Sequence, residues 1–339
     1  MPDPLLYLKA MGMAAIASAV GGLAIVAARR KGHAAWLCAA CVFSVAAGLV
    51  VGYSLLALQL SWPPRNGLER FLLLIAPAIL CVELLAAISS LPRWSVWSLR
   101  VTLALVLPRV LLHGSVYLGA SEHAWPARQA LLVMTAGGLL LAALWGLLTL
   151  LSRRATGMFV PCTLQASTLS AGLTVMMAGY IKGGVAALVW AAALLATVLV
   201  VGAITRNSSR LAEGAWSMLL GVAVVGLFSL VFIGRFFGEL STSKALVILL
   251  APLLGWVAEL PWLKCRQPWF VWSVRALLVA GALVAVLVLA KRKFDREMAP
   301  LLVNVEQSTV RPVANTDLVS WAKGRPRVAQ VMKHLRNVV

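Results

Sequence analysis

Ten long apolar runs, separated by short polar stretches, make up most of the chain. Each is close to the roughly 20 residues that an α-helix needs to cross the hydrocarbon core of a membrane. A transmembrane β-barrel would instead show short segments of alternating polarity. The pattern therefore predicts an all-α, polytopic transmembrane helix bundle of about ten spans. The runs cover residues 5–28, 34–60, 71–91, 99–119, 130–151, 158–180, 185–205, 215–235, 245–262 and 270–290.

The composition agrees with a membrane protein. Of the 339 residues, 61% are hydrophobic and 12% are charged, and the mean hydropathy is +0.92. The first run is followed, not preceded, by the basic cluster Arg29, Arg30 and Lys31. A cleavable signal peptide has the opposite order, so we expect this run to be retained as a transmembrane helix. We place the chain in the plasma (inner) membrane as a multi-pass protein.

A seven-residue phrase occurs twice in the chain. It reads WSVWSLR at 94–100 and WFVWSVR at 269–275, 175 residues apart. An Ala-Pro pair precedes each copy at the same spacing, at Ala76 and at Ala251. The interpretation is a duplication in which the first four runs resemble the last four. The offset of six spans is even, which makes the repeat parallel, not inverted.

The duplication sets the predicted organisation of the chain. Small residues also recur at every fourth position in the first run of each copy, as in close helix packing. These residues are Ala10, Ala14, Ser18 and Gly22, and then Gly183, Ala187 and Ala191. The parts are 1–120, a first repeat of four helices; 121–180, two linking helices; 181–290, a second repeat of four helices; and 291–339, a basic polar C-terminal tail.

The formal net charge of +19 does not indicate a nucleic-acid binder. The basic residues lie mostly in short loops and in the tail, where lipid headgroups are found. The odd-numbered loops carry most of the loop bases, which places them in the cytoplasm. The tail opens with Lys291, Arg292 and Lys293, and this basic cluster favours a cytoplasmic tail as well. Ten spans would place the tail on the side opposite to the odd-numbered loops, so either the tail is exported or one run does not span.

The end of the tail has an amphipathic pattern. Apolar residues fall on one helical face at Val328, Val331, Met332, Leu335 and Val338. Two interpretations are equally open: a short helix on anionic lipid headgroups or on a protein partner, and a solvated tail. The lipid bilayer is the partner that the sequence predicts most directly.

Few ionisable residues fall inside the runs, and two pairs of them follow the repeat. Glu83 and Arg100 lie at similar distances from the turn near residue 92, and so do Glu259 and Arg275 from the turn near 266. At about 1.5 Å per residue, the members of each pair share a depth on antiparallel neighbours. We expect structural ion pairs, with the alternative of two gates on a pathway. We expect interfacial anchors at Trp94, Trp97, Trp269 and Trp272.

Arg109 and His113 have no counterpart in the second copy. They are four residues apart on one helical face, next to Pro108, within the run 99–119. An arginine near the middle of a span requires a polar cavity, a carboxylate or a bound anion. The predictions are a substrate pathway at Arg109 and His113, or a buried arginine that is satisfied by Glu83 or by helix-end carbonyls.

The sixth run carries an unusual number of polar residues for a span. They are Thr163, Gln165, Ser167, Thr168, Ser170 and Thr174. Such residues line hydrated routes or hydrogen-bond neighbouring helices. We take Gln165 and Thr168 as further candidates for the pathway.

The sequence predicts no metal site, cofactor or catalytic residue. Cys38 and Cys41 are three apart in a helical run, without the histidines or second cysteine pair of a zinc site, and are expected to pack as small apolar residues. Nucleotide-binding, metalloprotease and hydrolase motifs do not occur.

Three functions follow from these observations. The first is a secondary transporter or permease for an amphipathic, lipid-like or anionic solute, with a pathway between two parallel repeats. The second is a non-catalytic scaffold or accessory subunit of a larger membrane complex. The third is an intramembrane enzyme acting on a lipid-linked substrate. Under the first two functions the protein is not an enzyme, and this is what we expect.

Overall fold

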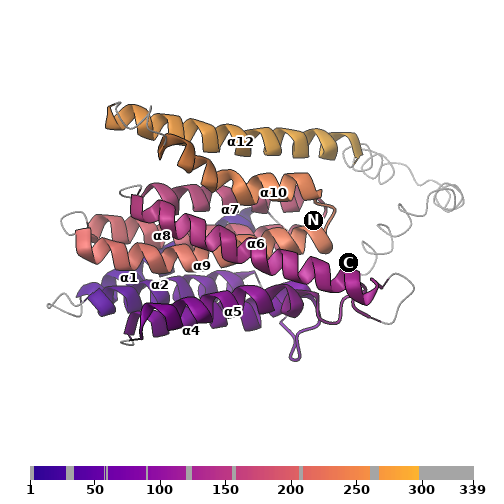
Figure 1. Cartoon of the computed structure of the whole chain (residues 1–339), viewed down its shortest axis with the longest axis horizontal. Coiled ribbons are helices and arrows are strands. Elements are labelled where there is room, and N and C mark those ends of the chain that lie inside the picture. The colour runs from indigo at the N-terminus through magenta and orange to yellow at the C-terminus, as the bar shows by residue number, and fades with distance from the viewer. Residues whose placement is uncertain are drawn as a thin grey trace, which may run out of the picture. The chain divides into compact units, whose positions relative to one another are not determined.

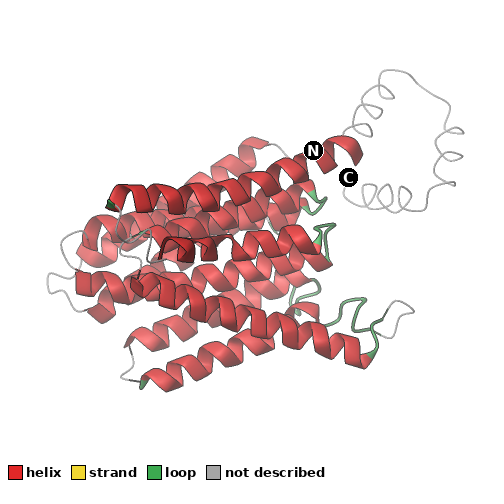
Figure 2. Ribbon diagram, turned by 45° about the horizontal axis from the view of Figure 1, so that its top comes forward, coloured by secondary structure: helices red, strands yellow, loops and turns green. Residues whose placement is uncertain are grey.

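The chain folds into a bundle of long helices, and the described residues form no strand (Figures 1 and 2). The computed structural model describes residues 4–27, 34–56, 58, 60–88, 91–119, 124–154, 158–205, 209–259 and 267–297. The prediction of an all-α helix bundle is confirmed. Its elements are α1 (Pro4–Ala27), α2 (Ala34–Leu55), α3 (Gly67–Arg70), η1 (Phe71–Ile75), α4 (Ala76–Ile88), α5 (Arg93–Leu112), α6 (Ala127–Arg154), α7 (Phe159–Met177), α8 (Ile181–Thr205), α9 (Ser209–Phe236), α10 (Thr242–Leu250), η2 (Ala251–Glu259) and α12 (Pro268–Glu297).

Each of the ten predicted runs corresponds to one helical segment, counting α3, η1 and α4 as one and α10 with η2 as another. Among the described residues, nine of these segments are long and apolar enough to cross a membrane. The protein is therefore a multi-pass membrane protein. The exception is α7, because its hydroxyl and amide side chains lower its hydropathy.

Helix α9 is the centre of the bundle. In an 18-residue window of its span Gly214–Phe236, 94% of the residues are buried inside the protein, whereas the corresponding share in the span of α12 is 22%. Glycines let large neighbours approach the α9 backbone. A Cβ on Gly226 would lie 2.2 Å from Trp190 Nε1 of α8, and one on Gly234 would lie 2.4 Å from Val175 of α7. These contacts place α7 and α8 on adjacent faces of α9.

The small residues of α1 form the predicted close packing seam. Ala10, Ala14 and Ser18 are fully buried. A Cβ on Gly48 of α2 would lie 1.9 Å from Ser18 Oγ and 2.6 Å from the Ala14 carbonyl oxygen. Ser44 of α2 donates a hydrogen bond to the Ser18 carbonyl. The two backbones are therefore in direct contact, which large side chains would prevent.

Two of the membrane segments are interrupted at the Ala-Pro positions of the repeated sequence. In the first of these segments the π-helical turn η1 ends at Ile75, directly before Ala76 and Pro77. In the other the α-helix ends at Leu250, and the 3₁₀ segment η2 starts at Ala251 and Pro252. Proline removes a backbone donor and disfavours regular α-helix at such a point.

Helix α12 packs on the rest of the bundle along a single stripe. The buried residues are Arg275, Val279, Leu283, Val286 and Ala290, spaced three or four apart on one face. Lys244 of α10 donates a hydrogen bond to the Leu289 carbonyl at 3.3 Å. The other faces of α12 are apolar and exposed, as in a helix that borders lipid.

The chain divides into two compact units, residues 1–290 and 291–339. Of the second unit, residues 291–297 complete α12. The amphipathic pattern at 328–338 lies outside the described residues, as does the rest of the tail beyond residue 297.

The position of α5 differs from the predicted run 99–119. The helix starts at Arg93, directly after Pro92, and ends at Leu112, before the left-handed Gly114 with φ 63°. Residues 113–119 form turns, although they include the hydrophobic residues Val116, Tyr117 and Leu118. The repeated phrase therefore lies inside the first two turns of α5, and Arg109 lies in its last turn.

Candidate functional site

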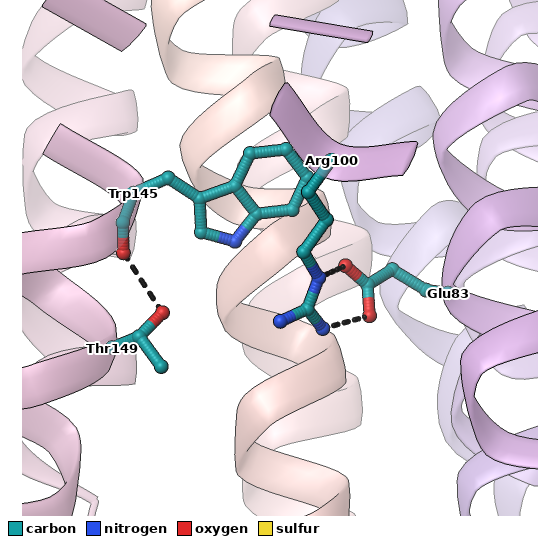
Figure 3. Close-up of polar contacts among 4 residues, drawn as sticks. All are labelled: Glu83, Arg100, Trp145 and Thr149. Carbon is teal, nitrogen blue, oxygen red and sulfur yellow. Dashed lines mark hydrogen bonds and ion pairs between the residues drawn. The ribbon is translucent and has the colours of Figure 1, made fainter. Parts of the chain in front are cut away.

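The polar core of the first hairpin is an ion pair between α4 and α5. Arg100 Nε donates to Glu83 Oε1 at 3.0 Å, and Arg100 Nη2 donates to Glu83 Oε2 at 2.7 Å (Figure 3). The Glu83 side chain is fully buried, and 7% of the Arg100 side chain is exposed. Parallel hydrogen bonds of this kind are the strongest geometry for a guanidinium and a carboxylate. The pairing of these two residues is the one expected from their depth.

Helices α6 and α9 enclose this pair. The Arg100 guanidinium lies 5.4 Å from the Trp145 ring centroid of α6, in the range of cation–π contacts. On α9, a Cβ at Gly221 would lie 2.2 Å from Glu83 Oε1 and 2.8 Å from the Trp145 ring. The missing side chain at Gly221 therefore leaves the space that the Glu83 carboxylate occupies. The Thr149 hydroxyl does not reach the pair, since it donates to the Trp145 carbonyl at 2.8 Å (Figure 3).

The second hairpin carries the corresponding pair between η2 and α12, and its side chains are slightly more exposed than those of the first pair. Arg275 Nη2 of α12 donates to Glu259 Oε1 of η2. The side chains are 11% and 9% exposed, and Arg275 Nε is buried without a hydrogen-bond partner. The guanidinium also lies 5.5 Å from the Phe159 ring centroid of α7. The second pair thus joins α12 to η2 and α7.

The four tryptophans of the repeated phrase lie in the first turns of α5 and α12. Trp94, Trp269 and Trp272 are exposed, and Trp97 is half-buried with its ring centroid 5.6 Å from the Arg100 guanidinium. Exposed indoles at the start of a span are typical of the membrane interface. Their role as interfacial anchors stays a prediction.

Arg109 and His113 do not lie in the interior of the bundle. Both are exposed, Arg109 in the last turn of α5 and His113 directly after it. The expectation of an arginine near the middle of a span is wrong, because the helix ends seven residues earlier than the apolar run. Glu83 forms its ion pair with Arg100, so it is not the counter-ion of Arg109. An arginine so near a helix end reaches the headgroup region and needs no internal partner.

The other two pathway candidates are buried in α7. Gln165 is 2% exposed, and neither its amide oxygen nor its amide nitrogen has a hydrogen-bond partner. It lies seven residues before Gly172, which contacts Ala187 and Leu188 of α8, so Gln165 faces α8 as well. Thr168 donates to the Leu164 carbonyl at 2.8 Å. The structure does not bring these two residues together with Arg109 and His113.

Two further residues of α7 complete its polar interior. Ser167 and Ser170 are 0% and 3% exposed, and their hydroxyls have no hydrogen-bond partner. The neighbouring Thr163 and Thr174 instead bond carbonyls of their own helix. The sequence showed the polar strip that includes both serines. It did not show which of its groups lack a partner, since that depends on the packing.

The described residues form neither a disulfide bond nor a cluster of metal ligands. Cys38 and Cys41 are buried, Cys81 and Cys162 are exposed, and all four are free thiols. No group of three described His, Cys, Asp or Glu side chains is close enough to hold a metal ion.

Comparisons with protein-family models, curated proteins and solved structures found no match to this chain. Its function is therefore inferred from its own geometry.

Proposed function

We propose that the chain is a secondary transporter or permease of the plasma (inner) membrane, and that α7 lines its substrate pathway. The observation that carries this proposal is the set of buried polar groups on α7 without partners: the Gln165 amide and the Ser167 and Ser170 hydroxyls. A buried polar group without a partner costs about 1–3 kcal/mol. Water or a solute that reaches α7 removes that cost.

The interrupted helices support the same proposal. Short or proline-interrupted segments at corresponding positions of two halves mark the binding region in many transporters. Here both interruptions occur at the Ala-Pro positions, at η1 and η2. We propose that they are equivalent parts of two parallel repeats, 1–120 and 181–290, linked by 121–180.

The chemistry of the interior favours an uncharged amphipathic solute. Arg100 and Arg275 are neutralised by glutamates, and Arg109 is exposed at a helix end. On α7 the groups left to meet a solute are an amide and hydroxyls, which donate and accept hydrogen bonds without net charge. Apolar side chains surround them. A solute with a small hydrogen-bonding head and an apolar body fits these surroundings.

A second candidate function is a scaffold subunit of a larger membrane complex. It is favoured by α12, whose exposed apolar faces include Phe270, Leu277, Val284 and Leu289. A scaffold requires no polar interior, so the two functions differ in the role of α7.

The proposal is tested by flux into proteoliposomes. Purified protein is reconstituted, and uptake of a panel of uncharged solutes is followed, from glycerol to short-chain fatty amides and monoacylglycerols. We expect uptake above that of empty liposomes for a subset of the panel, and its loss in Gln165→Leu. The matched control is Thr205→Val, which removes a buried hydroxyl that bonds the Val201 carbonyl of α8. Uptake that is unchanged in Gln165→Leu, or equal to that of empty liposomes for the whole panel, contradicts the pathway.

A further inference from the structure

One face of α7 carries a line of hydroxyls toward the interrupted helix α10–η2. Phe159 marks this face, since a Cβ on Gly255 of η2 would lie 2.8 Å from the Phe159 ring. Residues at intervals of three or four from Phe159 share its face. They are Thr163, Ser167, Ser170 and Thr174, all buried. Val175 faces α9 and Gly172 faces α8, so the hydroxyl face is the one that remains for α10 and η2.

The opposing backbone has a carbonyl group without its usual donor. Pro252 has no N–H, so the Ile248 carbonyl, four residues earlier, lacks the amide that an α-helix supplies. At about 1.5 Å per residue in α7, Ser167 lies roughly 12 Å along the helix from Phe159. With about 2.0 Å per residue in the 3₁₀ segment, Ile248 lies a similar distance from Gly255. Ser167 and the Ile248 carbonyl are therefore at the same level.

We propose that this interface between α7 and α10–η2 binds a monovalent cation, with sodium as the best fit. The ligands are the Ser167 and Ser170 hydroxyl oxygens and the Ile248 carbonyl oxygen. Oxygen ligands of this kind suit hard cations, and unwound carbonyls at interrupted helices hold sodium in membrane transporters.

The charge of the surroundings selects a monovalent ion. On this face α7 contributes hydroxyls, and the buried residues of α10 and the start of η2 are Ala245, Ile248, Leu249, Ala251 and Pro252. A divalent ion in a low-dielectric interior needs carboxylates. The nearest acid on η2 is Glu259, which is paired with Arg275.

The cation is the coupling ion of the proposed transporter, and that role rests on the proposed function. Binding itself does not rest on it. The first test is the thermal unfolding of the full chain in detergent micelles, followed by tryptophan fluorescence. Sodium, potassium and calcium chlorides are compared with choline chloride at equal ionic strength. A bound ion raises the unfolding midpoint in a saturable way. We expect this rise with sodium and a smaller one with calcium.

Three variants and one control locate the site. Ser167→Ala and Ser170→Ala each remove one ligand oxygen. Each variant is expected to raise by about tenfold the sodium concentration that gives half of the rise in the unfolding midpoint. Pro252→Ala restores the amide donor to the Ile248 carbonyl. It raises the midpoint in choline and abolishes the sodium rise, so loss of binding is separated from loss of folding. Thr205→Val keeps the full sodium rise.

Two results overturn the proposal: equal midpoints of the unchanged protein in sodium and choline, or a sodium rise that persists in all three variants. The flux assay gives an independent readout. Flux in choline with no sodium rise overturns the cation site and leaves the transport proposal standing. A sodium rise without flux overturns transport and supports the cation site.

Discussion

The two hairpins that share the repeated phrase place the same ion pair in different surroundings. In α4 and α5, Glu83 is fully buried, takes two hydrogen bonds from Arg100 and lies against α9. In η2 and α12, the side chains of Glu259 and Arg275 are 9% and 11% exposed, and Arg275 keeps a buried Nε without a partner. A glutamate and an arginine therefore join α4 to α5 in the core of the bundle, and the same two residue types attach α12 to η2 at the edge of the bundle. The difference is made by what packs against each pair.

Glu83→Gln is expected to give the largest effect. The change leaves the Arg100 charge buried without its counter-ion. Removing one partner of a buried pair costs about 3–5 kcal/mol. We expect the unfolding free energy in mixed micelles, followed by tryptophan fluorescence, to fall by this amount. Replacing both Glu83 and Arg100 with leucine should recover most of the loss. A double variant as unstable as the single one would contradict the account.

Gly221→Ala is expected to be the next largest. Its Cβ would meet Glu83 Oε1 at 2.2 Å, and overpacking of this kind costs about 1–3 kcal/mol. The matched control is Gly281→Ala in α12, where no atom lies within 4 Å of the added Cβ. In that helix alanine gains up to about 1 kcal/mol of helix propensity. We therefore expect the unfolding free energy to fall in Gly221→Ala and to rise in Gly281→Ala. Equal losses in the two variants would contradict the difference between the two hairpins.

Glu259→Gln is expected to cost less than Glu83→Gln. A charged hydrogen bond is lost at a side chain that is 9% exposed, at a cost of about 1.5–3 kcal/mol. Since α12 packs along one stripe, the loss should appear first as faster proteolysis near residue 267, directly before α12. An effect as large as that of Glu83→Gln would show that the second pair is equally central.

Trp94→Ala and Trp269→Ala are expected to give the smallest effects. Their side chains are 72% and 66% exposed, and such surface changes usually stay within about 0.5 kcal/mol of the unfolding free energy. The two variants should therefore be alike, unlike the two glutamate variants. A loss of several kcal/mol in either would assign that tryptophan to a packed interface.

The ion pairs could be predicted from the sequence because local geometry determines them. Glu83 and Arg100 lie at similar distances along the chain from the connection between α4 and α5, so equal rises along two antiparallel helices bring them together. The helix bundle itself followed from the length of the apolar runs. Both inferences need only chain spacing.

Arg109 and the serines of α7 required the structure. The predicted run that includes Arg109 continues beyond the helix, because Val116, Tyr117 and Leu118 extend it, whereas the helix ends before Gly114. Hydropathy alone does not show where a helix stops. Which hydroxyls of α7 lack partners depends on side-chain rotamers and on the helices that pack against each face, and neither is written in residue spacing.

The central claim is that the interior of α7 is a polar route, whereas the ion pairs hold the bundle together. The most direct test is labelling of single cysteines in a Cys-free background with a small membrane-impermeant thiol reagent. Positions 165, 167 and 170 are labelled from each side of the membrane, with the buried apolar Ala171 as the control position. The account predicts reaction at the three polar positions and protection at 171. Protection at all four positions would contradict it.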